Sequence, residues 1–398
     1  MSCFSEIALP EGPAGPDSGT AREVFAAGDH VCVAACARGG DGEIRLRVLR
    51  RGPGAGRWET AWEGIEEPGT EEAAPACSLV VRSVPLPEGG EVPMVRFLWP
   101  GGARLLRVDP VTGACAPAGD AEATAFPPGC RQLCRRDRDL VALCGEGRES
   151  RLLRLAPGSG TWEPLPLAAL EDADNREVSA LVVHAGALFA ATVNPESGFE
   201  LWRLESPDPV RARWSRVLER GAWRYAQNRR VLAALPRVGS LYLVAGTPAP
   251  ERTVESMFLD YQGPEVIRVD ADGHWDLLVG VPRVSPAGFQ VPLSGLGPGF
   301  DPRRRTEFGC AAVAGPYLVV AVADEEGFGL WLSTDGERWW RQPEPAWGEI
   351  HEVLGCRLYA TAAGLVVVVD HRTLDGERET RVWLGDLGCV VQKAAGGE

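Results

Sequence analysis

The sequence is almost without lysine: of its 41 basic residues, Lys393 is the sole lysine and all the others are arginine. No internal lysine is present to form a Schiff base or to act as the cation of a P-loop. Histidine is also scarce, and no histidine has a second ligand at metal-site spacing, so we expect no bound metal. The five histidines are His30, His184, His274, His351 and His371.

Long apolar runs are lacking too, so no transmembrane span is expected. Residues 1–15 contain no basic region followed by an apolar run, and we therefore expect no signal peptide. The eleven cysteines are odd in number and lie inside apolar runs such as 31–36. This pattern predicts free, buried thiols in a reducing compartment and thus a cytoplasmic protein.

Negative charge dominates, with 55 acidic against 41 basic residues and a net charge of −14. Such a chain repels phosphate backbones, and no arginine cluster is long enough to overcome this, so nucleic acid is excluded as a partner. A membrane partner is not expected either. The expected partner is a small-molecule substrate, with a protein partner as the other possibility.

Glycine and proline are abundant, at 48 and 32 residues, about a fifth of the chain. This density excludes long helices. A unit of four short alternating runs separated by turns recurs, most clearly over residues 178–219, and indicates four antiparallel strands. The central turns recur seven times, and most of their spacings are close to the propeller period of about 40–50 residues. They lie near Gly28, Gly89, Arg138, Gly186, Gly239, Gly315 and Gly364.

The repeat predicts an all-β, seven-bladed β-propeller of four-stranded antiparallel blades in a single domain. The expected blades cover residues 20–64, 75–119, 129–170, 176–220, 229–283, 306–347 and 356–394. We expect the C-terminal segment alone to complete the seventh blade with residues 389–394. The N-terminal residues 4–9 would then add a further outer strand beside it. Five of the seven third strands carry an arginine at the same offset, which is typical of an outward-facing position.

Two long segments, 247–263 and 282–305, interrupt the repeat. The first joins the second and third strands of blade five, and the second joins blade five to blade six. In antiparallel blades these two kinds of connection emerge on the same face, which they share with 220–230 between blades four and five. Long loops in compact domains are usually functional or disordered, and the aromatic residues here favour an ordered lid.

This face holds the candidate site. A carboxylate under an apolar lid would have a raised pKa and could accept a proton, while an arginine could bind an anion. The candidate catalytic residues are Asp260, Tyr261 and Glu307, and the candidate substrate-binding residues are Arg224, Tyr225, Arg176, Phe258 and Arg303. The alternative is that they are ordinary rim residues in salt bridges, with Arg303 in a solvated arginine run.

Other chemistries find no support. Ser294 lacks the strand–turn–helix context of a serine-hydrolase nucleophile, and no glycine-rich dinucleotide or phosphate motif opens a helix. We therefore expect no cofactor. The acidic runs 171–175 and 324–327 lack the pattern of a calcium loop and are interpreted as turns.

Residues 263–283, with P-E-V-I-R-V and W-D-L-L-V-G, and residues 291–300, with P-L-S-G-L, form a distinctive block. This block resembles a family of bacterial β-propeller proteins, as does G-F-E-L-W-R at 198–203. The family is loosely associated with enzymes of natural-product assembly that alkylate resorcinol rings or carboxylates. Residues 301–310 depart from the family pattern, which tends toward asparagine and aromatic residues there, so no residue role is carried over.

Two functions follow. One is a cofactor-independent enzyme of bacterial small-molecule metabolism that catalyses a cyclisation, alkylation or related C–C or C–O bond-forming step at the axial pocket. The other is a non-catalytic propeller that binds a protein or small ligand. A closed apolar pocket containing Asp260 or Glu307 beside an arginine would favour the enzyme, whereas an open face would favour the binding module.

Overall fold

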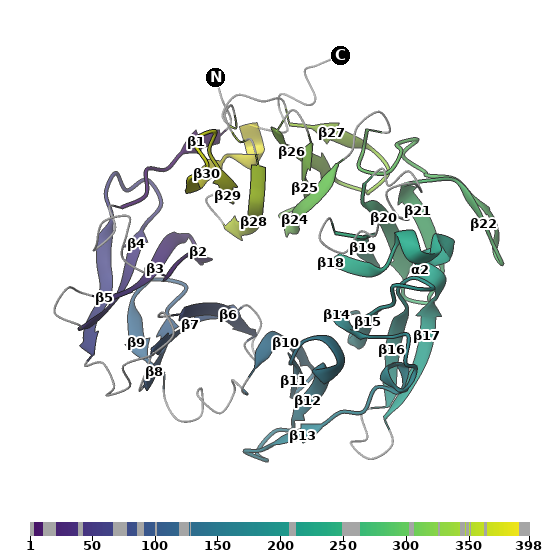
Figure 1. The fold of residues 1–398 in the computed structure, drawn as a ribbon, viewed down its shortest axis with the longest axis horizontal. Coiled ribbons are helices and arrows are strands. Elements are labelled where there is room, and N and C mark those ends of the chain that lie inside the picture. Colours follow the sequence, from purple (N-terminus) through teal and green to yellow (C-terminus); the bar gives the residue numbers. More distant parts are fainter. Residues whose placement is uncertain are drawn as a thin grey trace.

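The structure is a computed structural model of the chain. It describes residues 4–10, 21–38, 43–66, 78–85, 91–99, 102–118, 127, 129–206, 212–248, 263–301, 306–324, 327–342, 347, 350, 352–361 and 364–389. Seven four-stranded antiparallel sheets surround one axis, which confirms the predicted seven-bladed β-propeller (Figure 1). One extra two-stranded sheet lies outside the repeat.

The strands of each blade are counted from the axis outward. Blade one contains β2 (Ala21–Ala27), β3 (His30–Arg38), β4 (Ile44–Arg51) and β5 (Glu59–Glu66). Blade two contains β6 (Ser78–Pro85), β7 (Glu91–Trp99), β8 (Gly102–Val108) and β9 (Cys115–Pro117). Blade three contains β10 (Cys130–Arg136), β11 (Asp139–Cys144), β12 (Arg151–Leu155) and β13 (Trp162–Pro164). Blade four contains β14 (Glu177–His184), β15 (Ala187–Val193), β16 (Leu201–Ser206) and β17 (Arg213–Leu218). Blade five contains β18 (Arg230–Arg237), β19 (Ser240–Gly246), β20 (Glu265–Asp270) and β21 (Trp275–Val279).

Blade six contains β24 (Glu307–Ala314), β25 (Tyr317–Asp324), β26 (Gly327–Ser333) and β27 (Trp339–Arg341), and blade seven contains β28 (Glu352–Thr361), β29 (Gly364–Arg372) and β30 (Arg378–Gly385). The helical pieces are short: η1 (Gly147–Glu149), η2 (Ala168–Glu171), α2 (Arg220–Trp223) and η3 (Tyr225–Gln227). Residues 387–389 are helical as well. None of the helices described is long and apolar enough to cross a membrane.

The seventh blade closes the ring with the N-terminus. Strand β1 (Phe4–Glu6) pairs directly with β30, Phe4 opposite Gly385, and completes the sheet as its fourth strand. The expectation that residues 389–394 would supply that strand is therefore wrong, because β1 occupies its place. Phe4 is buried and its ring centroid lies 5.2 Å from that of Trp347, so apolar packing fixes the closing strand.

The core lies between the blades and is densest around their second strands. Five of the six residues of β11 are buried, as are the first six of β25, whereas every residue of the first strand β10 is only half-buried. The first strands contact one another around the ring, so the exposed part of their side chains faces the axis. We call the space that the seven first strands surround the axial channel.

Three cysteines of the described ranges depart from the expectation of free thiols: Cys310, Cys356 and Cys389 are disulfide-bonded. Cys310 of β24 and Cys356 of β28 form a disulfide between the first strands of blades six and seven, with Cα atoms 5.6 Å apart. The expectation was wrong for this pair because two cysteines far apart in sequence face each other across a blade boundary. Six other cysteines in the described ranges are free: Cys32, Cys36, Cys115, Cys130, Cys134 and Cys144.

Both long insertions fall where the sequence predicts. The 247–263 segment separates β19 from β20, and the 282–305 segment lies between β21 and β24. The second contains an unpredicted hairpin, β22 (Arg283–Ser285) paired with β23 (Gly288–Gln290). Figure 1 shows β22 at the outer rim, beyond β21 and away from the axis.

Candidate functional site

The predicted loop face exists over blades four and five, where several connections are joined by backbone hydrogen bonds. The Asn194 amide, in the connection between β15 and β16, donates to the Arg229 carbonyl before β18 at 2.9 Å. The Gly299 amide donates to the Pro264 carbonyl at 2.7 Å and so links the two insertions of blade five. Connections of the two predicted kinds thus meet on one face.

A buried ion cluster lies beneath this face, centred on Glu265, which is fully buried at the start of β20. Arg283 Nη1 donates to both Glu265 oxygens at 2.8 Å, and Arg224 Nη1 lies 3.5 Å from Oε1. Asn228 Nδ2 and the Val281 amide donate to the same carboxylate at 2.7 and 2.8 Å. One carboxylate therefore accepts hydrogen bonds from two connections, the one between β17 and β18 and the segment that follows β21.

Opposing effects set the ionisation of Glu265. Burial alone would raise its pKa, but the guanidinium groups of Arg224 and Arg283 and the hydrogen bonds to the carboxylate hold the pKa below its ordinary value. Glu265 is therefore ionised at neutral pH. Its carboxylate accepts hydrogen bonds from Arg283, Asn228 and the Val281 amide. Because these contacts occupy both oxygens, we assign Glu265 a structural role and not that of a general base.

Blade four contains an equivalent arrangement, in which a buried glutamate accepts hydrogen bonds from an asparagine and an arginine. Glu200, 8% exposed at the start of the third strand, accepts a hydrogen bond from Asn175 Nδ2 at 2.8 Å and from Arg216 Nη1 at 2.8 Å. Asn175 lies two residues before the first strand of blade four, as Asn228 does in blade five. The repeated asparagine–glutamate pair ties the entry of each blade to its third strand.

Between the clusters around Glu200 and Glu265, the backbone forms a left-handed turn over Arg220–Trp223. The four φ angles are 53°, 59°, 53° and 66° in chain order, and Gly221 is the one glycine among them. A left-handed conformation costs about 1–2 kcal/mol for each non-glycine residue, so the fold must hold this turn in place. It does so through the Gly221 amide, which donates to the Phe199 carbonyl at 2.9 Å, and through Asn228 Nδ2, which donates to the Gly221 carbonyl at 3.0 Å.

The turn presents three side chains to the surface. The Arg220 guanidinium lies 4.8 Å from the ring centroid of Trp223 and 6.0 Å from that of Tyr225. The two rings meet edge-on at 6.3 Å, and Tyr225 is 48% exposed. This arrangement is a solvated cation–π cluster of an arginine, a tryptophan and a tyrosine, which can bind a ligand.

The other predicted site residues do not assemble around this cluster. Arg176 and Glu196 are exposed and lie 3.7 Å apart as a surface ion pair. Glu307 is half-buried at the start of β24. Asp260, Tyr261, Phe258 and Arg303 lie outside the described residues. Among the predicted residues in the described ranges, Arg224 lies in the buried ion cluster, Tyr225 lies in the exposed cation–π cluster, and Arg176 lies in a surface ion pair.

The axial channel has a charge opposite to that of the whole chain. Its first strands carry eight arginines and four glutamates, a net charge of +4, in a protein of net charge −14. The arginines are Arg22, Arg82, Arg131, Arg135, Arg136, Arg230, Arg237 and Arg357, and the glutamates are Glu23, Glu177, Glu307 and Glu352. Two arginines pair with acids of neighbouring blades: Arg230 with Glu177 at 2.5 Å and Arg357 with Glu23 at 3.6 Å.

The first strands of blades two and three differ, because their four arginines bond only to neutral oxygens within the part of the chain that the structure describes. Arg82 donates to the Val81 carbonyl, Arg131 to Val178 O and Ser150 Oγ, Arg135 to Pro85 O, and Arg136 to Gly186 O, at 2.7–3.3 Å. Arg82 Nε, Arg131 Nε and Arg136 Nη1 are buried without an acceptor among these residues. Six hydrogen bonds thus serve about twenty N–H donors.

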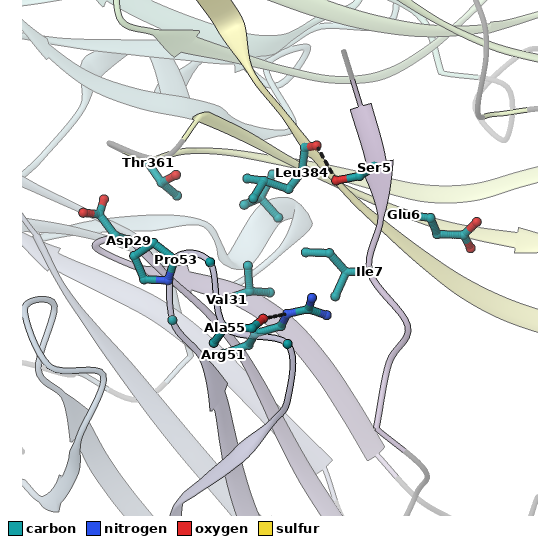
Figure 2. A pocket seen from close by; sticks show the side chains of 14 residues that line it. Ser5, Glu6, Ile7, Asp29, Val31, Arg51, Pro53, Ala55, Thr361 and Leu384 are labelled. Carbon is teal, nitrogen blue, oxygen red and sulfur yellow. Dashed lines mark hydrogen bonds between the residues drawn. The ribbon is translucent and has the colours of Figure 1, made fainter. Parts of the chain in front are cut away.

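A cavity of about 260 Å³ lies elsewhere, between blades seven and one where the ring closes. Figure 2 shows an apolar wall that includes Ile7, Val31 and Leu384, with the Arg51 side chain donating to the Ala55 carbonyl at 2.8 Å. Glu6 points away from the other labelled side chains and lies 3.5 Å from Arg381. Arg51 and Glu6, two of the charged side chains that line the cavity, are thus engaged by other groups of the protein.

Sequence reasoning missed Glu265, Arg283 and the channel arginines. Glu265 and Arg283 stand near the two ends of the 263–283 block, but nothing local indicates that they meet. The channel arginines carried a usable signal, since β6 and β10 together contain four arginines and no acid in a strongly acidic chain. No group of three or more metal-ligating side chains is found among the residues described.

Comparisons with known proteins bear on the fold alone. No protein-family model and no curated protein matches the chain. Among solved structures, the polysaccharide lyase Uly1 is 10% identical with a TM-score of 0.50, over 95% of this chain and 91% of that one. The β-propeller domain of the trilobed protease from Pyrococcus furiosus is 11% identical with a TM-score of 0.46, over 92% and 94%.

The acylaminoacyl peptidase of Pyrococcus horikoshii is also 11% identical, with a TM-score of 0.48, over 95% of this chain. This chain spans about half of the length of that peptidase, 54%.

Proposed function

We propose that the protein is a non-catalytic binding module that holds a small, multiply charged anion in its axial channel, against the first strands of blades two and three. The observation that carries this proposal is the set of four channel arginines, Arg82, Arg131, Arg135 and Arg136, that bond only to neutral oxygens among the described residues. Buried cationic donors without acceptors are costly, and an anionic ligand would satisfy them.

The arginines that line the channel at blades two and three indicate which class of ligand would bind there. Arginine binds carboxylate and phosphate oxygens through charge-assisted hydrogen bonds, and a lined channel concentrates its field on such groups. Arg131 and Arg136 are five residues apart on one strand, a span of about 16 Å. A ligand with two or more anionic groups, such as a polycarboxylate or an oligophosphate, fits this spacing better than a single small ion.

The alternative is the cofactor-independent enzyme of small-molecule metabolism, with a cyclisation, alkylation or related bond-forming step. Its proton acceptor would be Asp260, Tyr261 or Glu307, and its anion anchor would be Arg224. Arg224 is already engaged by Glu265, and Glu307 begins a different blade from the Arg220 cluster. The geometry of the described residues therefore favours the binding module.

The proposal is tested by isothermal titration of the full chain with citrate and with tripolyphosphate. We expect one of these anions to bind, and the double variant R82Q/R135Q to weaken that binding at least about tenfold, since each charge-assisted hydrogen bond contributes roughly 1.5–3 kcal/mol. The matched control is R47Q/R154Q, which removes two arginines of third strands, whose partners are Glu63 of the outer strand β5 and Asp139 of the second strand β11. Equal loss in both variants, or no binding of either anion, would contradict the proposal.

A further inference from the structure

The β22–β23 hairpin displays an exposed apolar surface that neither the axial channel nor the ion cluster uses. Val284 and Phe289 are cross-strand partners, and their exposed fractions are 73% and 68%. Val291 and Leu293 follow in the same segment, at 48% and 47%. These four side chains are the hairpin patch. Contiguous exposed apolar side chains on a soluble protein mark interaction surfaces more often than isolated ones do.

The hairpin is held firmly at both ends. Arg283 in β22 is bonded to the buried Glu265, and its guanidinium lies 5.8 Å from the ring centroid of Trp275. The Leu293 amide donates to the Leu277 carbonyl of the outer strand β21 at 2.9 Å. A two-stranded hairpin is marginally stable by itself, so these anchors are what present the hairpin patch in a fixed position.

Charge selects the partner. Residues 220–230 and 281–300, which form the left-handed turn and the hairpin segment, contain five arginines and no acidic residue, in a chain with 55 acids. Of these arginines, Arg220 is exposed on its aromatic cluster beside β22. A partner that buries the hairpin patch beside Arg220 is therefore expected to combine large apolar side chains with acidic ones.

The backbone indicates the partner's shape. Within the described part of the chain, β22 and β23 pair only with each other, so the sheet has two free edges. An extended segment can add a strand to such an edge and place alternate side chains against the apolar face. We propose that the hairpin patch docks an extended protein segment in which acidic residues alternate with large apolar ones.

The test selects short random peptides that bind the full-length protein. We expect the selected peptides to be rich in Asp or Glu and in large apolar residues, and to bind V284S/F289S at least about tenfold more weakly than wild type. The control V111S/L374S removes two side chains that are each 81% exposed elsewhere, and it should bind as wild type does. R82Q/R135Q should also bind as wild type does, because this site is independent of the channel.

Several results would overturn the proposal. Selected peptides that bind V284S/F289S as tightly as wild type would show that the hairpin patch is not the docking surface. Selected peptides without acidic residues would contradict the assigned chemistry. A dimer that sedimentation equilibrium detects in wild type and not in V284S/F289S would assign the patch to a second copy of the chain. Both substituted side chains are largely exposed, so an unchanged melting temperature will show that the variant folds.

Discussion

Arginines on two sides of this propeller serve different ends. At blades four and five, Arg224 and Arg283 are more than nine-tenths buried as side chains and share the carboxylate of Glu265. At blades two and three, Arg82 and Arg135 are half-buried and bond only to carbonyl oxygens among the residues described. The first pair shares one buried carboxylate within the protein and holds the loops. For the second pair, we propose that the charge is used to bind a ligand. The role of an arginine in this propeller is therefore indicated better by the group that accepts its hydrogen bonds than by its position in the fold.

We predict the largest effect on stability for a substitution in the buried ion cluster around Glu265. Substitution of Glu265 by Gln leaves Arg224 and Arg283 buried without a counter-charge, and we expect the free energy of unfolding to fall by about 3–5 kcal/mol. Urea denaturation measures this loss. As a control, D276N breaks the more exposed Arg268–Asp276 pair and should cost no more than about 1 kcal/mol. Equal losses in the two variants would mean that burial does not distinguish these pairs.

The same carboxylate predicts a pH dependence. The pKa of Glu265 is lower in the folded state than its ordinary value of 4.5, so its contribution to stability is present above pH 4.5 and is lost as the pH falls through the lowered folded value. The stability difference between wild type and E265Q should therefore shrink on acidification below pH 4.5. Denaturation series at several pH values measure it, and a constant difference would contradict the assignment.

A smaller effect is expected at the left-handed turn. A Cβ at Gly221 would lie 2.8 Å from the backbone oxygen of Asn228, and φ is +59°, so G221A should lower stability by about 2 kcal/mol or more. Gly239 also has positive φ, +82°, but nothing lies within 4 Å of its Cβ position. G239A should cost only about 1 kcal/mol, and thermal unfolding of the two variants compares them. Equal losses would show that the contact with Asn228 is unimportant.

The sequence predicted the repeat well because the signal is local. Period-2 alternation and a glycine at most of the central turns, such as Gly186 and Gly239, recur along the chain. The ring closure was mispredicted since residues 4–9 and 389–394 both read as outer strands, and only long-range pairing chooses between them. Residues 282–305 were predicted as a loop, and the hairpin within it spans only three residues on each side.

The site was less predictable because its determinants are non-local. Arg224 was identified as an anion anchor, but its acceptor Glu265 lies 41 residues away in sequence. The left-handed turn has a single glycine, Gly221, and so gave little warning of four successive positive φ angles. The channel arginines become a group only when β6 and β10 are placed side by side.

We propose that the arginines of blades two and three bind an anion. Diffraction from a crystal of the protein soaked in sodium tungstate tests this proposal directly, because tungstate is an oxyanion with strong anomalous scattering. We expect an anomalous peak within hydrogen-bond distance of at least two of the guanidinium groups of Arg82, Arg131, Arg135 and Arg136. Tungstate found only elsewhere on the protein, or a channel without any peak, would contradict it.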